Sequence, residues 1–333
     1  MSAARSAADL VGRRISIDVP ATTANLGAGF DALALALDLA TVISVDVVPA
    51  TTRPDVHVEV RGEGAGQLPT GRRNRFVTAL LGGLSALAID PAGAGWHVSM
   101  TNRIPVARGL GSSASATVAA LVAADALAGG GLGRERMLEL AAVSEGHADN
   151  AAAAIYGGLC VVTTVDGVPR AIRFEPPEAL LAALYIPDRH LSTAAMRAAL
   201  PPTVPFADAV HNVGAATLAL AALSQGRLDL LAPGTVDRLH EPYRARAYPE
   251  LPELIGAALA AGAKGACLSG AGSTVIAFSD DVAAAATIAA AMERRAQSLG
   301  MTGRAAVQAA RAEGARVIED GDVRPAGPGA RLT

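Results

Sequence analysis

A glycine-rich turn that leads into a long helical run is the feature that most restricts the fold of this chain. Residues 105–114 read Pro-Val-Ala-Arg-Gly-Leu-Gly-Ser-Ser-Ala, and strong helix formers follow as far as the glycines at 129–131. Gly109 and Gly111 tolerate backbone angles that other residues avoid, which lets the chain turn sharply close to a ligand. The serine pair at 112–113 stands where a helix N-cap is expected. Because free amides and the helix dipole attract anions, the turn predicts a phosphate site.

This turn is not a Walker-type loop, which would end in Gly-Lys-Ser or Gly-Lys-Thr. Lys264 is the only lysine in the sequence. Backbone amides, the helix dipole, a metal ion and Arg108 therefore remain to balance phosphate charge. A glycine-serine turn is also common as an ordinary serine-capped loop, and the turn alone leaves that interpretation open.

Length and composition limit the class of protein. A chain of 333 residues can bury a sizeable core and predicts two domains of ordinary size. Hydrophobic residues make up 51%, but much of this is alanine, and no apolar run approaches the ~20 residues of a membrane-spanning helix. The longest run, residues 282–292, is flanked by charges and predicts a surface helix with one buried face. The N-terminus lacks the apolar segment of a signal peptide, so we expect a cytoplasmic protein without a membrane partner.

Charge and cysteine content exclude further classes. The net charge is −3 and aromatic residues make up 3%, so no basic patch alternates with stacking rings and we expect no nucleic-acid partner. Cys160 and Cys267 both lie in apolar, strand-like segments. We expect two buried free thiols in a reducing compartment, and two isolated cysteines cannot form a zinc site.

The pattern along the chain predicts alternating strands and helices. Residues 20–31 are rich in glycine, asparagine and aspartate and predict a loop between strands, where sites tend to lie. Expected strands are 14–19, 41–48, 55–60, 97–101, 182–186 and 305–308, with a strand-turn-strand unit at 265–278, and expected helices include 74–87, 135–144, 192–199, 251–261 and 282–299.

Four segments carry a family resemblance. Residues 105–114 resemble the nucleotide-binding motif of the GHMP kinases, which include galactokinase, homoserine kinase and mevalonate kinase. Residues 20–39, with Pro-Ala-Thr-Thr-Ala-Asn-Leu-Gly-Ala-Gly-Phe-Asp, resemble the first motif as the homoserine kinases carry it. Residues 145–158, with Glu-Gly-His-Ala-Asp-Asn and Tyr-Gly-Gly, and residues 265–275, with Leu-Ser-Gly-Ala-Gly-Ser-Thr, resemble two more.

The resemblance implies an α+β fold with two domains. The N-terminal ATP-binding domain, residues 14–170, would be ribosomal-protein-S5-like and contain a left-handed βαβ unit, against the usual right-handed rule. The C-terminal domain, residues 171–318, would be ferredoxin-like. Residues 1–13 and 319–333 are predicted to be flexible tails.

The resemblance also implies an activity and a substrate. An ATP- and Mg²⁺-dependent kinase would phosphorylate the hydroxyl of L-homoserine in threonine biosynthesis. Arg197 and Arg244 would hold the substrate carboxylate, Asp31 the ammonium group, and Asn25 and Asn150 the hydroxyl. The implied substrate-binding residues are Asn25, Asp31, His147, Asn150, Arg197 and Arg244, and the implied catalytic residues are Asn25, Asn150 and Arg197.

On the nucleotide side the resemblance assigns a second set of residues. Glu139 matches the family's magnesium-binding glutamate, and Ser112 or Ser113 would add a hydroxyl oxygen, a ligand type that Mg²⁺ prefers. Asn74 matches a position near the adenine. The implied nucleotide-binding residues are Asn74, Pro105, Arg108, Gly109, Leu110, Gly111, Ser112, Ser113, Ala114 and Thr193.

Mevalonate kinases carry an aspartate that activates the substrate hydroxyl, and the resemblance places Asn150 at that position. An amide cannot accept a proton, so we hypothesise that positioning and charge neutralisation suffice and that His147 is not a general base. Where the family pattern has proline, this sequence has Ala28, Ala148, Ala153 and Ser273, a change that affects rigidity more than chemistry.

Two alternative functions and the oligomeric state remain open from sequence. The chain could be a GHMP kinase for another small hydroxy amino acid, or a GHMP-fold binding protein without activity. A homodimer is plausible, but the sequence does not determine the oligomeric state.

Overall fold

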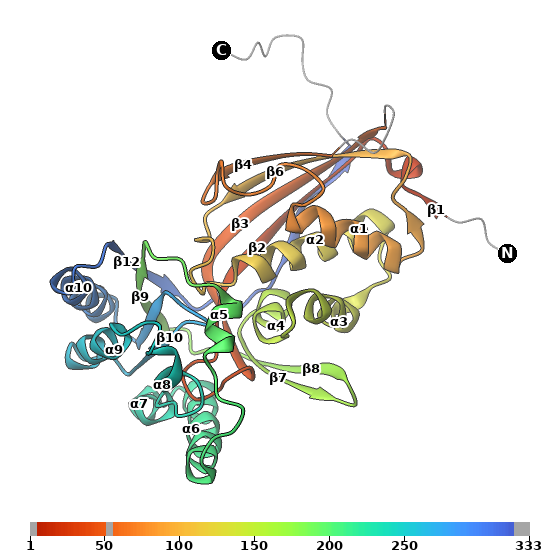
Figure 1. Ribbon diagram of the computed structural model, residues 1–333. Helices are drawn as coiled ribbons and strands as arrows, with labels where there is room; N and C mark the ends of the chain where they lie inside the picture. Colours follow the sequence, from red (N-terminus) through yellow and green to blue (C-terminus); the bar gives the residue numbers. More distant parts are fainter. Residues whose placement is uncertain (1–4, 51–55, 323–333) are drawn as a thin grey trace.

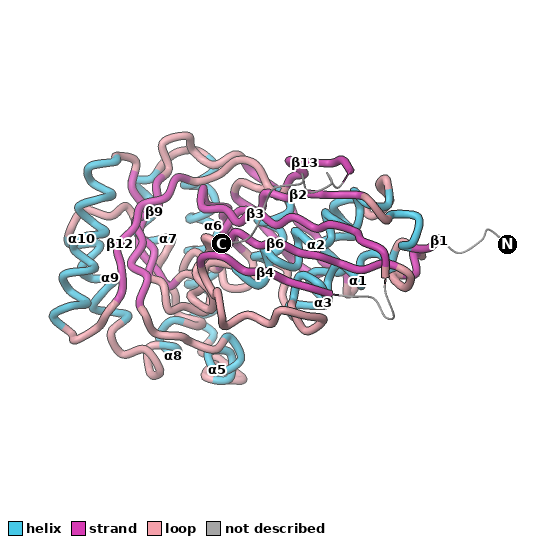
Figure 2. Tube along the Cα trace, turned by 90° about the horizontal axis from the view of Figure 1, so that it is seen from above, coloured by secondary structure: helices cyan, strands magenta, loops and turns pink. Residues whose placement is uncertain are grey.

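The computed structural model describes residues 5–50 and 56–322. Two large sheets lie side by side in this part, each covered by helices (Figures 1 and 2), and residues 5–6 and 89–90 form a third, two-stranded parallel sheet. The first part of the chain contains β1 (Arg5–Ser6), the 3₁₀ turn Ala7–Leu10, β2 (Arg13–Ala24), β3 (Leu33–Pro49), β4 (Val56–Gly62), α1 (Arg75–Ala86), β5 (Ile89–Asp90), β6 (Ala94–Asn102), α2 (Ser112–Ala128), α3 (Gly133–Glu145), α4 (Asp149–Tyr156), β7 (Leu159–Val165) and β8 (Val168–Phe174).

The N-terminal sheet has the strand order β13-β2-β3-β6-β4, and β7 and β8 extend it from the start of β3. β4 and β6 are parallel neighbours and are joined through α1, as in a βαβ unit. Helices α1 and α2 lie against one face of this sheet, and α3 and α4 lie beside them (Figure 1). Alternating residues such as Val45 and Trp96 are buried between sheet and helices.

The second part of the chain forms the smaller sheet. It contains β9 (Leu181–Pro187), α5 (Thr193–Ala198), α6 (Phe206–Ser224), the 3₁₀ turn Leu228–Leu230, α7 (Leu231–Gly234), α8 (Glu241–Arg244), α9 (Leu251–Ala260), β10 (Gly265–Leu268), β11 (Val275–Ser279), α10 (Val282–Ser298), β12 (Gly303–Ala309) and β13 (Arg316–Asp322). The antiparallel order β10-β11-β9-β12 is that of a ferredoxin-like sheet. The two-domain α+β fold implied by the resemblance is confirmed.

Alternation along β9 separates two hydrophobic cores. Ala183 and Tyr185 face α9 and α10, whereas Leu184 and Ile186 face α6, α7 and the residues that follow β2. This second core includes Leu26 and therefore fixes the first-motif loop against the smaller sheet. The site described below lies where the two sheets meet.

Several sequence-based predictions of structure are confirmed, and residues 5–13 and 319–322 differ from the flexible tails predicted for them. Helices α1 and α10 and the strands β9 to β12 lie where they were predicted, and Cys160 and Cys267 are buried free thiols. Residues 5–13 were predicted to be part of a tail, but they form β1, a 3₁₀ turn and the start of β2. Residues 319–322 were also predicted to be part of a tail, but they belong to β13, which pairs with β2. The boundary at 170/171 falls inside β8, which still pairs with β7. Residues 1–4 and 323–333 lie outside the described part.

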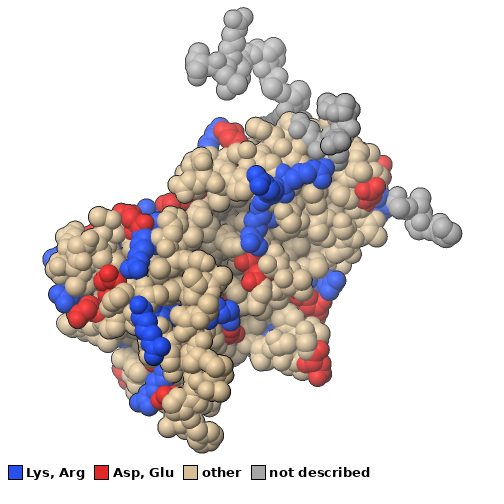
Figure 3. All heavy atoms as spheres, in the orientation of Figure 1, with Lys and Arg blue, Asp and Glu red and all other residues tan. Residues whose placement is uncertain are grey.

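Helix α6 is the one helix in the described part that is long and apolar enough to cross a membrane, by length and composition alone. Ala215, Ala219 and Leu223 of this helix are buried, and Ala219 and Leu223 contribute to the second core. On the face drawn in Figure 3, basic and acidic side chains are interspersed, except for one short run of basic side chains.

Candidate active site

Three loops from distant parts of the chain pack against one another around the glycine turn. The amide of Thr22 donates to the Leu110 carbonyl at 3.2 Å, and the Ser269 hydroxyl donates to the Gly109 carbonyl at 2.6 Å. A Cβ at Gly109 would overlap the Ser269 carbonyl oxygen, and a Cβ at Gly111 would overlap the hydroxyl of Thr22. Both glycines also have positive φ, 77° and 71°. Glycine is needed here for close packing of the loops as well as for the turn.

The start of α2 differs from its prediction. Gly111, not a serine, is the N-cap, and it has no side chain with which to cap the helix. Ser112 and Ser113 are the first two helical residues, and both line the pocket. The first turn of α2 therefore faces the pocket without a capping side chain, as an anion site at a helix N-terminus requires. The helix ends at Gly129 with φ 79°, as predicted.

A polar pocket lies in front of this helix. It brings together the predicted residues Asn25, Asp31, Arg108, Gly109, Gly111, Ser112, Ser113, Ala114, His147, Asn150, Thr193, Arg197 and Arg244, and adds Ala107, Glu145, Asp149, Gly270 and Ala271. These residues come from the loop between β2 and β3, the glycine turn and start of α2, the end of α3, the start of α4 and the segment before it, α5, α8, and the turn between β10 and β11.

A second, more apolar pocket adjoins the first. Ile43, Leu68 and Met100 line it, and it shares Ser112 and Thr193 with the polar pocket. Asn74 also lines it, but its side chain is the N-cap of α1: Oδ1 accepts from the Phe76 amide at 3.0 Å and Nδ2 donates to the Pro69 carbonyl at 2.8 Å, so this residue shapes the pocket wall.

Three predicted residues do not reach either pocket. Leu110 is fully buried in the second core. Pro105 lines a separate hollow beside Arg304. The carboxylate of Glu139 pairs with Arg136 at 2.6 Å, one turn away on the same helix, and lines a third hollow.

Glu145, and not Glu139, is the glutamate of α3 that lines the polar pocket. Glu145 is the last residue of α3, and its carboxylate accepts hydrogen bonds from the hydroxyls of Ser113 and Thr117, both at 2.8 Å. Its side chain is 7% exposed and pairs with Arg75 at 3.0 Å. Glu139 lies nearly two turns earlier on α3 and lines the third hollow, so the magnesium role that the resemblance gives it stays a prediction. A carboxylate beside serine hydroxyls fits the oxygen ligands that Mg²⁺ prefers.

Arg197 and Arg244 both line the polar pocket, in different surroundings. Arg197 forms a bidentate ion pair with Asp31, at 2.8 and 2.9 Å, which raises the pKa of Arg197. Arg244 is buried, and burial together with the nearby Arg197 lowers its pKa. Both guanidinium groups lie over the ring of Phe30, at 5.5 and 5.2 Å from its centroid, a residue that sequence reasoning missed.

His147 and Asn150 are joined by Asp149, a buried residue that sequence reasoning also missed. Asp149 Oδ1 lies 2.9 Å from Nδ1 of His147 and accepts from the Asn150 amide at 2.7 Å. This hydrogen bond raises the pKa of His147 against the opposing effect of burial. Asn150 Oδ1 accepts from the hydroxyl of Thr22 at 2.8 Å, so this segment is tied to β2. Both Glu145 and Asp149 stand in the Glu-Gly-His-Ala-Asp-Asn segment, which was the available signal.

Asn25 has protein partners for both side-chain atoms. Its Nδ2 donates to the Gly270 carbonyl at 2.9 Å, and its Oδ1 accepts from the Asp31 amide at 3.0 Å. The side chain is buried and joins the first-motif loop to the third. Its contact with the substrate hydroxyl stays a prediction.

Family models match both halves of this fold. The GHMP kinases N terminal domain matches residues 76–158, which include the glycine turn, and the GHMP kinases C terminal domain matches residues 219–298. Together the fold and the pocket define the GHMP kinase class.

Individual relatives narrow the class. A homoserine kinase of Streptomyces avermitilis is 41% identical over 273 residues, covering 81% of this chain and 87% of its own length. A homoserine kinase of Synechococcus sp. (strain WH7803) is 41% identical over 89% of this chain and 93% of its own. The crystal structure of a homoserine kinase from Cytophaga hutchinsonii has a TM-score of 0.81 at 28% identity, covering 92% of this chain and 97% of its own. The chain belongs to the homoserine kinase family.

Proposed function

We propose that this protein transfers the γ-phosphoryl group of ATP to the side-chain hydroxyl of L-homoserine, giving O-phospho-L-homoserine for threonine biosynthesis. The observation that carries the proposal is the single pocket in which Asp31, Arg197 and Arg244 face the start of α2. Homoserine has a carboxylate, an ammonium group and a hydroxyl, and this pocket has charged groups of both signs beside a phosphate site. Asp31 argues against mevalonate or shikimate, which have no ammonium group.

On the nucleotide side, the uncapped first turn of α2 would bind phosphate oxygens and the apolar pocket the nucleoside. Glu145 with Ser112 and Ser113 would hold Mg²⁺, which neutralises phosphate charge when bound. Thr193 borders both pockets and would lie between nucleotide and substrate.

On the homoserine side, Arg244 and Arg197 would bind the carboxylate and Asp31 the ammonium group. Binding in this way exchanges part of the Asp31–Arg197 ion pair for contacts with the substrate. Asn150, fixed by Thr22 and Asp149, would orient the hydroxyl.

We propose further that no side chain acts as a general base. The raised pKa of His147 favours its cationic form, which suits contact with an anion better than proton abstraction. Phosphoryl transfer through a loose transition state depends mainly on positioning and charge neutralisation. The pH–rate profile of kcat in His147→Gln should keep the shape of the wild-type profile. Loss of a limb that rises with pH, with homoserine binding retained, would contradict this.

A coupled ADP-release assay with Mg-ATP tests the function. L-Homoserine, D-homoserine, L-serine, L-threonine, mevalonate and shikimate are compared as acceptors. We expect preference for L-homoserine and a loss of ~10²-fold or more in kcat/KM in Arg197→Ala and Arg244→Ala, because each removes a cation that would pair with the substrate carboxylate. Turnover of another hydroxy amino acid would support that alternative, and ATP binding without any turnover would indicate a binding protein. A cytoplasmic location and a homodimer remain predictions, the latter tested by sedimentation velocity.

A further inference from the structure

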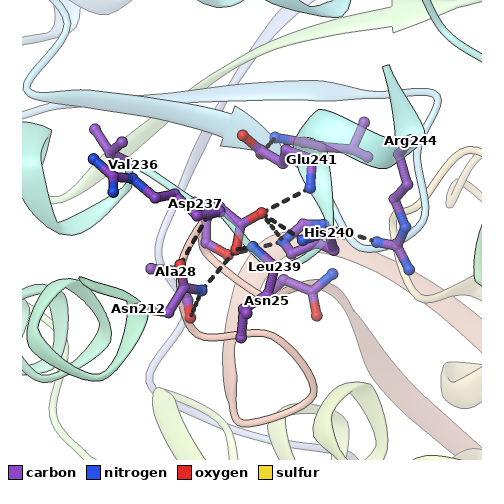
Figure 4. Close-up of polar contacts among 12 residues, drawn as sticks. Asn25, Ala28, Asn212, Val236, Asp237, Leu239, His240, Glu241 and Arg244 are labelled. Carbon is purple, nitrogen blue, oxygen red and sulfur yellow. Dashed lines mark hydrogen bonds and ion pairs between the residues drawn. The ribbon is translucent and has the colours of Figure 1, made fainter. Parts of the chain in front are cut away.

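His240 has a buried imidazole ring beside Arg244 (Figure 4). Both of its ring nitrogens have protein partners. Nε2 lies 2.9 Å from the Gly27 carbonyl, and Nδ1 lies 3.1 Å from Nη1 of Arg244. A carbonyl only accepts and a guanidinium only donates. The hydrogen of the ring must therefore be on Nε2, while Nδ1 accepts from Arg244.

The surroundings keep this tautomer neutral. Burial, with a smaller contribution from Arg244, lowers the pKa of His240 to about 4 although Asp237 opposes the shift. The other partners of Arg244 are the Gly270 carbonyl, 2.9 Å from Nη1, and the Met196 carbonyl, 3.4 Å from Nε. All three partners are neutral, so they orient the guanidinium without forming an ion pair with it.

Asp237 fixes the backbone on which His240 stands. Its Oδ2 accepts from the amides of His240 and Glu241, both at 2.7 Å, and its Oδ1 accepts from Nδ2 of Asn212 at 2.7 Å. Asn212 also donates to the Ala28 carbonyl at 3.0 Å. One cluster thus holds two successive carbonyls of the first-motif loop, that of Gly27 through His240 and that of Ala28 through Asn212 (Figure 4).

Phe30 completes the connection to the substrate side. The His240 ring stacks on Phe30 with centroids 5.0 Å apart, and the guanidinium of Arg244 lies over the same ring. Asp31 follows directly in the chain. We propose that His240 is a positioning residue for the homoserine site, which holds the Arg244 guanidinium and the loop that carries Asp31 at a fixed separation. This inference rests on the proposed homoserine phosphorylation.

Two conservative substitutions separate the two contacts of the ring. In His240→Asn the side-chain oxygen stands near the position of Nδ1 and can still accept from Arg244. In His240→Gln the amide nitrogen stands near Nε2 and can still donate to the Gly27 carbonyl, but the acceptor for Arg244 is lost. We expect the KM for homoserine to rise ~10-fold in His240→Gln and ~3-fold in His240→Asn, with the KM for ATP changed less than ~2-fold in both.

The matched control is His211→Gln. His211 lies on α6 and contacts the Val236 carbonyl at 3.1 Å, next to the same turn but away from Arg244. We expect it to leave both KM values unchanged. In an Arg244→Lys background, His240→Gln should add less than its effect alone, because the two residues act through one contact.

The outcomes separate this inference from the function it rests on. If the wild-type protein does not phosphorylate homoserine, the proposed function fails. If it does, unchanged homoserine KM values in both His240 variants, or equal increases for homoserine and ATP, overturn the positioning role. A ¹⁵N-histidine spectrum of the wild-type protein gives a test that does not depend on folding of the variants. One ring should remain the neutral Nε2–H tautomer at pH 5 and its Nδ1 signal should shift on addition of homoserine, but not of ATP. No such shift contradicts the proposal.

Discussion

The side of the pocket that we propose for the nucleotide is formed by backbone, whereas the side that we propose for homoserine, here called the homoserine side, is formed by charged side chains from segments far apart in sequence. The turn at 109–111 and the first two residues of α2 are contiguous, and glycine conformation decides their shape. Asp31, Arg197 and Arg244 come from the first-motif loop, α5 and α8, and only the packing of the smaller sheet brings them together. A local motif can therefore specify the first side, while the second depends on the tertiary structure. Glu145 lies between the two sides and provides the sharpest test.

The largest effect is expected for Glu145→Gln. The amide keeps a hydrogen-bond acceptor for Ser113 and Thr117 but removes the charge that would bind Mg²⁺. We expect kcat to fall ~10²- to 10³-fold and the Mg²⁺ concentration for half-maximal rate to increase. Initial rates over a range of Mg²⁺ concentrations measure both.

Glu139→Gln is the matched control, because it removes the same charge from the same helix nearly two turns away. Its Arg136 partner lies on the surface, so the rate should change less than ~2-fold. A large loss in Glu139→Gln with a normal rate in Glu145→Gln would restore the assignment made by sequence spacing.

Gly111→Ala tests whether the turn depends on contact between loops. The new Cβ would overlap the hydroxyl of Thr22, which donates to Asn150, and the residue would keep a positive φ. We expect a loss of ~2–4 kcal/mol in the free energy of unfolding, the sum of strain and overpacking, measured by urea denaturation. The change should also weaken homoserine binding through Asn150.

Gly129→Ala separates the cost of a left-handed backbone conformation from the cost of a steric overlap. Gly129 has φ 79°, but a Cβ added at this position would meet no atom of another part of the chain within 4 Å. Only the backbone cost of ~1 kcal/mol is therefore expected. Equal losses in the two variants would mean that the left-handed conformation alone explains the glycine at 111.

The same contrast explains what could be predicted from the sequence. The glycine turn, helix α2 and its end at Gly129 are determined by neighbours in the chain, and these predictions are confirmed. The prediction that a serine caps α2 was wrong: the N-cap is Gly111. This glycine packs on Thr22, a contact that the local sequence pattern does not reveal. Glu139 was assigned from the family resemblance, whereas the glutamate that contacts Ser113 in the structure is Glu145 at the end of α3. β13 was missed because its partner β2 lies about the length of the whole chain away.

Within the homoserine side, most predicted residues line one pocket because the motifs that carry them match in order and spacing. The groups that fix them were not predicted. Asp149 contacts its chain neighbours His147 and Asn150, so its segment contained a signal that was not used. His240 and Asp237 have partners far along the chain, Gly27 and Asn212, so their roles emerge only from the packed structure. Phe30 belongs in the same class, since two arginines and an imidazole meet on its ring only after folding.

The smallest expected effect is the pH dependence that His147 gives to stability. The hydrogen bond to Asp149 raises the folded-state pKa of His147 above its ordinary value of ~6.5. Such a group contributes stability that is fully present below the unfolded-state pKa and is lost as pH rises through the folded-state pKa. Urea unfolding of the wild-type protein between pH 5 and 9 should show a small decrease in the free energy of unfolding on the alkaline side of ~6.5. The difference in stability between the wild-type protein and Asp149→Asn should shrink over the same interval, because the variant lacks the carboxylate that favours the cation. A difference that grows with pH would mean that Asp149 acts on the neutral imidazole, which would return His147 to consideration as a base.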